Sequence, residues 1–435
     1  MKKYISILLL LSNIVFSETY KDKFLVYVNN SYVNFDISKN LKQTSDPNLN
    51  KYLKNYDVKQ IVKWLPNARK NDRDGEIYLN RFYVIKLNKE HDFLESTIES
   101  IVELEIIDRA ELMGIMKTEY EPNDPYYSTQ WFLPNIRADL AFDLWDISNG
   151  ELPGSSEENP IVVGVVDVGL DWDHPDLVNN LWQNLGEDID GDGVVIEYSG
   201  GSWIFDSGDI NGIDDDGDGY IDNFIGWDAA YNDNNPNPPS NNYDHGTMVA
   251  GCVSASTDNG IGVASVGWNI KLMGMNSSTD DYTVTHADEG FLAAAQMGAD
   301  VINLSLGSIG ACNSWQNLVN VAYNTYGCII VASSGNGGQN GWTNFDLHSP
   351  SSCANVISVT ATDPVDQFDC WATAGTTVDL SAPGWQIRTT DVGGGYTYTQ
   401  GTSFSSPIVA GAAALLKSRY PNATNSFIEG LIINN

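Results

Sequence analysis

Short, largely apolar runs recur from residue 161 onward, separated by segments rich in Gly, Asn and Ser. These runs are Ile161–Val166, Ile270–Met275, Val301–Leu306, Cys328–Ala332 and Val356–Val359. Runs of this length without polar alternation are typical of strands buried on both faces of a parallel sheet. Stretches of helical length that contain Ala and Gly lie between them, at Ala287–Met297, Trp315–Tyr323 and Pro407–Lys417. The alternation predicts a three-layer α/β domain with a mainly parallel central sheet, whose ligands would lie at the carboxyl ends of the strands.

The first 120 residues have a different texture and predict a small, separate α+β unit. Arg81–Leu87 alternates well enough for a strand, and Phe93–Leu104 has apolar residues at helical spacing. Residues 24–64, rich in Asn, Lys and Tyr, give no firm prediction of elements. The turn-forming sequence Glu121–Pro125 marks the boundary with the α/β domain.

The two parts also differ in charge. The 435 residues contain 23 Lys and Arg against 57 Asp and Glu, a net charge of −34. Residues 1–120 carry 18 basic and 17 acidic residues, whereas residues 121–435 carry 5 and 40. Because a nucleic acid needs a basic footprint on its partner and an anionic membrane surface attracts basic segments, we expect neither as a partner.

The N-terminus has the pattern of a secretory signal at residues 1–17. Lys2 and Lys3 form a charged start, Ile5–Phe16 forms an apolar stretch, and Ser17 suits a small-residue cleavage site. The alternative is an uncleaved membrane anchor, but a spanning helix needs about 20 apolar residues. We therefore expect a soluble protein, secreted to the extracellular space, with no membrane segment after removal of the signal.

The cysteines fit an oxidising compartment. There are five of them, at positions 252, 312, 328, 353 and 370, and none lies in a CxxC motif. An odd count leaves at least one thiol unpaired within the chain. Cys252, among Val249, Ala250 and Val253, is expected to be that thiol and to pack in the core. The pairing of the others stays open.

Three segments carry residue types that cooperate in nucleophilic catalysis. Asp167 follows the first apolar run, His245 begins a stretch of small residues, and Ser403 lies where a helix begins shortly before Pro407. A serine hydroxyl is a weak nucleophile that needs an adjacent base, and imidazole has a suitable pKa for that task. A buried carboxylate orients the imidazole and stabilises its cation. Each residue taken alone has a structural alternative, such as a helix cap for Asp or Ser.

The three segments together resemble the signature blocks of the subtilisin-like serine proteases, or subtilases. Their sequences are Val-Val-Asp167-Val-Gly, Asp-His245-Gly-Thr and Gly-Thr-Ser403-Phe-Ser-Ser-Pro, in the chain order Asp, His, Ser. The resemblance runs from about Asp124 to the end and implies a subtilisin-like fold. It implies Asp167 as the orienting acid, His245 as general base and acid, and Ser403 as the nucleophile that forms an acyl-enzyme. It also implies that Asn336, in Ser-Ser-Gly-Asn-Gly-Gly, donates to the oxyanion beside the Ser403 backbone N–H.

The resemblance implies a substrate cleft as well. Subtilases bind a peptide as an extended strand between two backbone segments. The matching segments are Ser305-Leu306-Gly307 and Ser333-Ser334-Gly335. Their small residues would let a peptide backbone approach and form a pocket for the side chain that precedes the scissile bond.

Three positions depart from the family pattern. Val168 replaces the usual Ser or Thr after the catalytic Asp, Phe404 replaces a common Met, and Ser405 replaces a common Ala. None of them is a member of the triad, so we expect tuned activity and not a dead enzyme.

An unusually acidic insertion, at about residues 185–228, lies between the Asp and His blocks. It contains two copies of a loop with carboxylates at alternate positions and Gly at the sixth. The candidate ligands are Asp188, Asp190 and Asp192 in the first copy, and Asp214, Asp216, Asp218 and Asp222 in the second. Converging carboxylates at a sharp glycine turn are typical of Ca²⁺ loops. The twelfth-position Glu of an EF-hand is absent from both, and a merely solvated acidic loop is the alternative.

The resemblance implies a further calcium site that ties the mature N-terminus to the body of the domain. Asp124 and Asp176 match its side-chain ligands. The loop Thr257–Val263 matches the segment that adds carbonyls and one side chain, which is Asn259 or, because the alignment slips by one residue, Asp258.

The resemblance also implies an order of parts: a signal peptide at 1–17, a propeptide at 18–119 that assists folding and inhibits until it is cleaved, and a catalytic domain at 120–435. The family usually continues past a final helix such as Phe427–Ile433, so a fragment that lacks a C-terminal part is an open alternative. We expect a secreted, monomeric, calcium-dependent serine endopeptidase that cleaves proteins and peptides, with its own propeptide as intramolecular inhibitor. The rival hypothesis is a catalytically inactive, calcium-stabilised binding or adhesion module on a subtilase scaffold.

Overall fold

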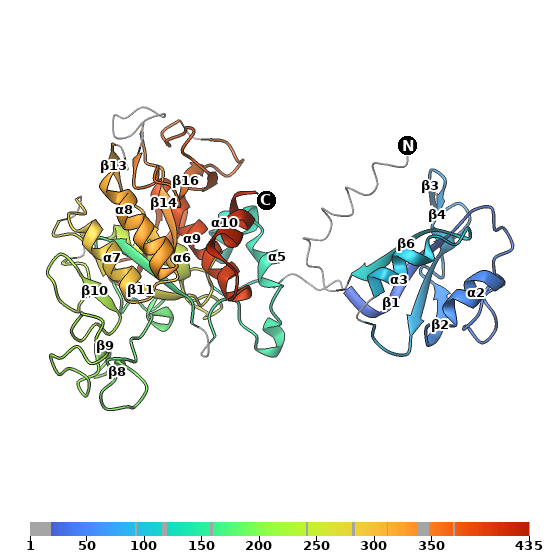
Figure 1. Cartoon of the computed structure of the whole chain (residues 1–435), viewed down its shortest axis with the longest axis horizontal. Helices are drawn as coiled ribbons and strands as arrows, with labels where there is room; N and C mark the ends of the chain where they lie inside the picture. The colour runs from blue at the N-terminus through green and yellow to red at the C-terminus, as the bar shows by residue number, and fades with distance from the viewer. Residues whose placement is uncertain are drawn as a thin grey trace. The chain divides into compact units, whose positions relative to one another are not determined.

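The computed structural model describes residues 19–91, 94–114, 120–156, 160–240, 242–280, 283–310, 312–337, 348–368 and 370–434. The predicted signal at 1–17 lies outside these residues. The chain forms two compact units, Met1–Thr118 and Glu119–Asn435 (Figure 1). No helix of the described residues is long and apolar enough to cross a membrane.

The first unit is an antiparallel sheet with two helices. Its strands, in the order β2-β5-β1-β6, are β2 (Val58–Lys63), β5 (Phe82–Leu87), β1 (Thr19–Val28) and β6 (Ile107–Gly114). Its helices are α2 (Pro47–Leu53) and α3 (Leu94–Ile101), and a small hairpin joins β3 (Arg73–Asp74) to β4 (Ile77–Tyr78). Phe24, Ile61, Ile85 and Ile101 belong to its own buried core. The strand predicted at Arg81–Leu87 is confirmed as β5. The helix predicted at Phe93–Leu104 is confirmed as α3, which ends earlier, at Ile101; Phe93 lies outside the described residues.

The second unit is built on a sheet of seven strands. In sheet order these are β10 (Gly226–Asp228), β11 (Lys271–Asn276), β7 (Val162–Asp167), β12 (Val301–Leu304), β14 (Ile329–Ser333), β16 (Ile357–Thr362) and β17 (Leu380–Pro383). Every neighbouring pair is parallel. All five predicted apolar runs are strands of this sheet. The two edge strands, β10 and β17, were not predicted, because neither Gly-Trp-Asp nor Leu-Ser-Ala-Pro is a continuous apolar run.

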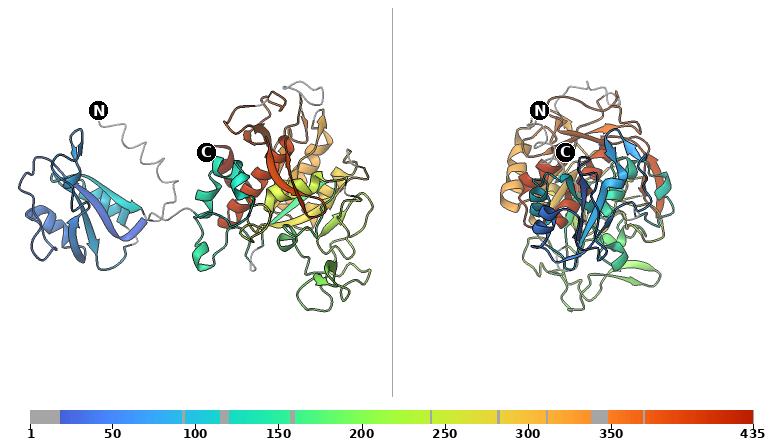
Figure 2. Two further views of the ribbon diagram at one scale, coloured as in Figure 1. Left: turned by 180° about the vertical axis from the view of Figure 1, so that it is seen from behind. Right: turned by 90° about the vertical axis from the view of Figure 1, so that its right-hand side faces the viewer.

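Helices cover both faces of this sheet (Figures 1 and 2). They are α6 (His245–Ser254), α7 (Ala287–Gln296), α8 (Ser314–Val321), α9 (Thr402–Arg419) and α10 (Asn425–Ile433). Alternate residues of β7 face opposite layers: Val163 and Val165 share one core with α6 and α9, whereas Val162 and Val166 share another with α7 and α8. The predicted three-layer α/β fold is therefore confirmed.

Short elements complete the second unit. They are α4 (Phe132–Asn135), α5 (Ala138–Phe142) and three antiparallel strand pairs: β8 (Ile196–Ser199) with β9 (Ser202–Phe205), β13 (Ser308–Ile309) with β15 (His348–Ser349), and β18 (Ile387–Asp391) with β19 (Gly395–Thr399). The β8–β9 hairpin lies in the acidic insertion and projects from the body of the unit (Figure 1).

One disulfide joins Cys312 to Cys353, with a Cα–Cα distance of 5.3 Å. Cys252 is a buried free thiol, as expected, within α6. Cys328, which is buried, and Cys370, which is exposed, are free as well.

Candidate active site

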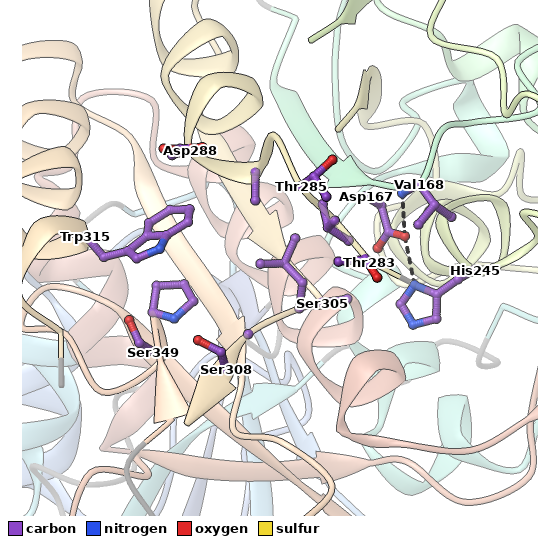
Figure 3. Close-up of a pocket in the computed structure, with 15 residues that line it drawn as sticks. Asp167, Val168, His245, Thr283, Thr285, Asp288, Ser305, Ser308, Trp315 and Ser349 are labelled. Atoms are coloured by element: carbon purple, nitrogen blue, oxygen red, sulfur yellow. Dashed lines mark hydrogen bonds and ion pairs between the residues drawn. The ribbon is translucent and has the colours of Figure 1, made fainter. Parts of the chain in front are cut away.

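Asp167 and His245 meet at the carboxyl end of the parallel sheet. Asp167 is the last residue of β7 and is buried. His245 is the first residue of α6. Its Nδ1 lies 2.8 Å from Asp167 Oδ1, and the two side chains border one cavity (Figure 3). This is the geometry that holds an imidazole in a single orientation.

The two oxygens of the Asp167 carboxylate have different surroundings. Oδ1 also accepts a hydrogen bond from the Val168 N–H at 2.8 Å. Oδ2 is buried and has no hydrogen-bond partner among the described residues. Val168, at the position where the family usually has Ser or Thr, supplies no hydroxyl to the carboxylate.

Ser403 lies at the start of α9, beside the segment that follows β12. Its Oγ donates to the Ser305 carbonyl at 3.3 Å, and Ser305 Oγ donates to the Ser403 carbonyl at 2.7 Å. Among the described residues, the hydroxyl of Ser403, the candidate nucleophile, therefore donates to a backbone carbonyl and not to His245. Hydrogen bonds between catalytic groups often tighten only when substrate binds. The Phe404 ring packs against the His245 imidazole, with 5.6 Å between ring centroids. This departure from the family pattern therefore places an aromatic ring against the candidate general base.

The Asn336 side chain faces the beginning of the same helix. Its Oδ1 accepts from the Thr402 N–H at 3.0 Å and from the Thr402 hydroxyl at 3.1 Å. Because the carbonyl oxygen is engaged in this way, the amide Nδ2 is the group left to donate.

A cavity of about 630 Å³ runs past Asp167 and His245 (Figure 3). Ser305, Leu306 and Gly307 line it, as does Ser308 of β13. Thr283, Asp288 of α7 and Trp315 of α8 also line it and were not predicted from the sequence. None of these residues lies in a local motif, so only the tertiary structure identifies them.

The second predicted segment, Ser333-Ser334-Gly335, begins at the last residue of the neighbouring strand β14 but is not among the residues that line this cavity. Its backbone is held by the Ser334 N–H bond to the Val359 carbonyl. The buried imidazole of His348 lies between the two segments, since a Cβ added to either Gly307 or Gly335 would meet its ring. His348 is a further residue that the sequence did not single out.

The charges around His245 favour its protonated form. Burial by itself lowers the pKa of His245, but the negative charges of Asp167 and Asp244 and the hydrogen bond to Asp167 outweigh burial. The pKa of His245 therefore lies above its ordinary value of 6.5.

A pH profile tests this balance. A general base acts in its neutral form, so kcat/KM should rise with pH through the pKa of His245, with a midpoint above 6.5. Asp244→Asn removes one of the charges that raise this pKa, and the midpoint should move to lower pH. Glu197→Gln, in strand β8, is the matched control and should leave the profile in place. An unmoved midpoint in Asp244→Asn would contradict the role given to that charge.

Comparison with known proteins adds the family. The model of the subtilase family matches residues 158–435. The chain belongs to the subtilase family. It is 32% identical to the thermophilic serine proteinase of Bacillus sp. (strain AK1) over 352 residues, 80% of this chain and 72% of that protein. It is also 32% identical to thermitase from Thermoactinomyces vulgaris over 309 residues, 70% of this chain and 88% of that protein.

A solved structure agrees with the family. Proteases from Pseudoalteromonas arctica PAMC 21717 match with a TM-score of 0.51 and 26% identity, over 72% of this chain and 92% of that chain. As a member of its family, this subtilase is a serine endopeptidase.

In this subtilase, residues of the calcium site implied at the mature N-terminus lie close together. Asp176 is fully buried, its Oδ1 accepts from Asn259 Nδ2 at 2.7 Å, and burial raises its pKa to about 7. Asp124 Oδ2 accepts from the Asp258 N–H, while its buried Oδ1 has no partner among the described residues. The Asp258 carboxylate instead binds the Tyr120 hydroxyl at 2.7 Å. Of the two alternatives left by the sequence, Asn259 is therefore the side chain beside Asp176.

The two acidic loops have the same local structure. Asp188 accepts from the Gly191 and Gly193 N–H groups, at 2.7 and 2.9 Å. Asp214 accepts from the Gly217 and Gly219 N–H groups at the same two distances. All four glycines have positive φ, between 76° and 104°, which other residues rarely adopt. The repeated sequence pattern thus corresponds to a repeated loop.

Carboxylates from outside the repeats join both loops. Among the described residues, three triplets have one oxygen from each member within 4.8 Å of the others: Glu187, Asp214 and Asp216; Asp188, Asp190 and Asp209; and Asp190, Asp192 and Asp206. Asp218 and Asp222 lie outside these triplets; Asp218 Oδ2 accepts from Asn223 and Asp222 accepts from the Gly212 N–H. The sequence did not single out Glu187, Asp206 or Asp209. Glu187 directly precedes the first loop and could have been noticed, but the other two lie beyond the β8–β9 hairpin.

Proposed function

We propose that this subtilase is a secreted, calcium-dependent endopeptidase that hydrolyses peptide bonds through Asp167, His245 and Ser403. The observation that carries the proposal is the 2.8 Å contact between His245 Nδ1 and buried Asp167 Oδ1, at the mouth of a cavity bordered by the Ser305 segment that binds Ser403. Its substrates are extended protein or peptide segments that lie along Ser305, Leu306 and Gly307.

In the proposed reaction His245 Nε2 takes the proton of Ser403 Oγ while Oγ attacks the carbonyl carbon of the scissile bond. The carbonyl oxygen becomes an oxyanion, which receives hydrogen bonds from Asn336 Nδ2 and the Ser403 N–H. His245 returns the proton to the leaving amine as the C–N bond breaks, and an acyl-enzyme ester remains. Water then attacks the ester with the same assistance, which releases the acid and restores Ser403. Asp167 orients the imidazole and stabilises its cation.

The rival, an inactive binding module on the same scaffold, is less favoured because Asp167, His245, Asn336 and Ser403 are all present and His245 is hydrogen-bonded to Asp167. Labelling with a serine-directed fluorophosphonate separates the two hypotheses. We expect one label, on the peptide that contains Ser403, in calcium-loaded protein freed of residues 18–119. An unlabelled but folded protein would favour the binding module.

We propose calcium as the metal because the candidate ligands are all hard oxygen donors. Asp124, Asp176 and Asn259 would hold one ion, with Asn259 turned so that its Oδ1 faces the ion, and the acidic loops would hold others. The unpartnered Asp124 Oδ1 and the burial of Asp176 fit a cation that the protein itself does not supply. Bound there, calcium would cross-link segments distant in sequence and neutralise buried charge.

Chelation tests the calcium proposal. Excess chelator should lower the melting temperature, since a metal that binds only the folded state stabilises it by mass action. One site held at about 100 times its Kd contributes roughly 2.7 kcal/mol. The measurement uses the Ser403→Ala protein, so that self-digestion does not contribute, with calcium-saturated chelator as the control. An unchanged melting temperature would argue against bound calcium.

We further propose that residues 1–17 direct export and that residues 18–119 are an inhibitory propeptide. The support for the second part is that Met1–Thr118 forms a compact unit with its own core, close to neutral in charge beside a strongly acidic catalytic unit. Isolated residues 18–119 should inhibit the mature enzyme in trans, more strongly at low salt than at high salt. Full activity with an excess of this fragment at low salt would refute the inhibitory role.

A further inference from the structure

The base of the β8–β9 hairpin brings together two segments that the hairpin separates in sequence, residues 188–193 and 206–209. The Ile189 N–H donates to Asp209 Oδ1 at 2.9 Å, and the Asp206 N–H donates to the Val195 carbonyl at 3.0 Å. A Cβ added to Gly208 would overlap the Asp190 carboxylate. The second segment is thus folded directly over the first acidic loop.

Five carboxylates converge at this contact. Asp188, Asp190 and Asp209 form one triplet, and Asp190, Asp192 and Asp206 form another, so the two triplets share Asp190. Asp206 is 8% exposed and Asp209 is fully buried. The second oxygen of Asp209, Oδ2, has no hydrogen-bond partner among the described residues. A buried, unpartnered carboxylate oxygen inside an acidic cluster is costly unless a cation binds it.

The surrounding sequence offers no basic side chain as that cation. Residues 138–270 contain neither Lys nor Arg, and Lys271, the next basic residue, donates to the Asn179 carbonyl. One divalent cation would leave three of the five negative charges uncompensated, whereas two would leave one.

We propose that the base of this hairpin is a two-cation site, in which Asp190 bridges two divalent ions of the Ca²⁺ class. Asp188 and Asp209 complete the ligands of one ion, and Asp192 and Asp206 complete those of the other. The site deepens the calcium part of the proposed function, on which the choice of metal rests, but it does not depend on proteolysis.

The position of the site gives it a structural consequence. Phe205, directly before Asp206, stacks on Trp172 with 5.1 Å between ring centroids and contacts Phe224 at 5.3 Å. Trp172 follows the strand that ends at Asp167. The two ions would therefore hold the hairpin on the aromatic cluster that packs beside β7.

Ion counting tests the proposal. Native mass spectrometry of the full chain, in the Ser403→Ala background, reports the bound Ca²⁺ directly. Asp190→Asn should lose two ions, Asp206→Asn and Asp209→Asn should lose one each, and the control Glu197→Gln should lose none. Loss of only one ion from Asp190→Asn, or of no ion from Asp206→Asn or Asp209→Asn, would overturn the bridged site.

A second measurement needs no substitution that could disturb folding. Mn²⁺ exchanged into the Ser403→Ala chain should give the electron paramagnetic resonance signature of a coupled pair, because one carboxylate links the two ions. Spectra of isolated Mn²⁺ ions alone would overturn the proposal. Fluorophosphonate labelling of the active enzyme reports separately on the proposed function, so failure of one does not imply failure of the other.

Discussion

Replacing Ser403 with Ala should lower kcat by about 10⁶-fold, because the attacking oxygen is lost and the remaining groups can only polarise the substrate. The fold should persist, since the hydrogen bond that Ser403 Oγ makes within the described part of the chain is one of 3.3 Å to the Ser305 carbonyl. The measurement is kcat on a peptide substrate, with the melting temperature as a check of folding.

Ser405→Ala is the matched control for this experiment. It removes a hydroxyl from the same helix turn, where Ser405 Oγ donates to the Ala382 and Pro383 carbonyls at 3.1 Å. We expect the control to lose some stability, about 1 kcal/mol, and to keep most of its activity. Comparable activity in Ser403→Ala and in the unaltered enzyme would eliminate Ser403 as the nucleophile.

Asp167→Asn should give the second largest loss, about 10⁴-fold in kcat. Asp167 Oδ1 accepts from both His245 Nδ1 and the Val168 N–H, and an amide that turned its nitrogen toward the imidazole would impose the wrong tautomer. Even with the oxygen in place, the charge that stabilises the imidazolium would be gone.

The pH profile distinguishes this electrostatic role from a merely structural one. Loss of the Asp167 charge should move the acid limb of kcat/KM to lower pH, because that charge raises the pKa of His245. Asp171→Asn is the control, since its carboxylate accepts from the Gly393 N–H. If Asp167→Asn lowered kcat no more than the control does, Asp167 would not be the orienting acid.

The central sheet was readable from the sequence because its strands are buried on both faces. Burial on both sides removes polar alternation, so runs such as Ile161–Val166 stand out and became β7 and its neighbours. The edge strands β10 and β17 are short, and they were missed. In the first unit, β1, α2 and β2 fell in a segment that had no clear pattern.

The residues of the candidate site could likewise be predicted only in part. Asp167, His245 and Ser403 were identified because each lies in a short motif with a local signature, and the acidic loops because their spacing repeats within a few residues. Their mutual contacts depend on strands and helices that pack across long separations; the 2.8 Å bond between His245 and Asp167 spans 78 residues.

By itself, the sequence determined the fold class, the candidate triad, the two glycine-turn loops and the acidity of the second unit, since all of these are encoded in local pattern and composition. The tertiary structure decided which groups lie together: His348 between Gly307 and Gly335, Asn259 beside Asp176, and Asp206 and Asp209 over the first acidic loop. These contacts form only when the chain folds back across a hairpin or a sheet, and no short window of sequence contains both partners.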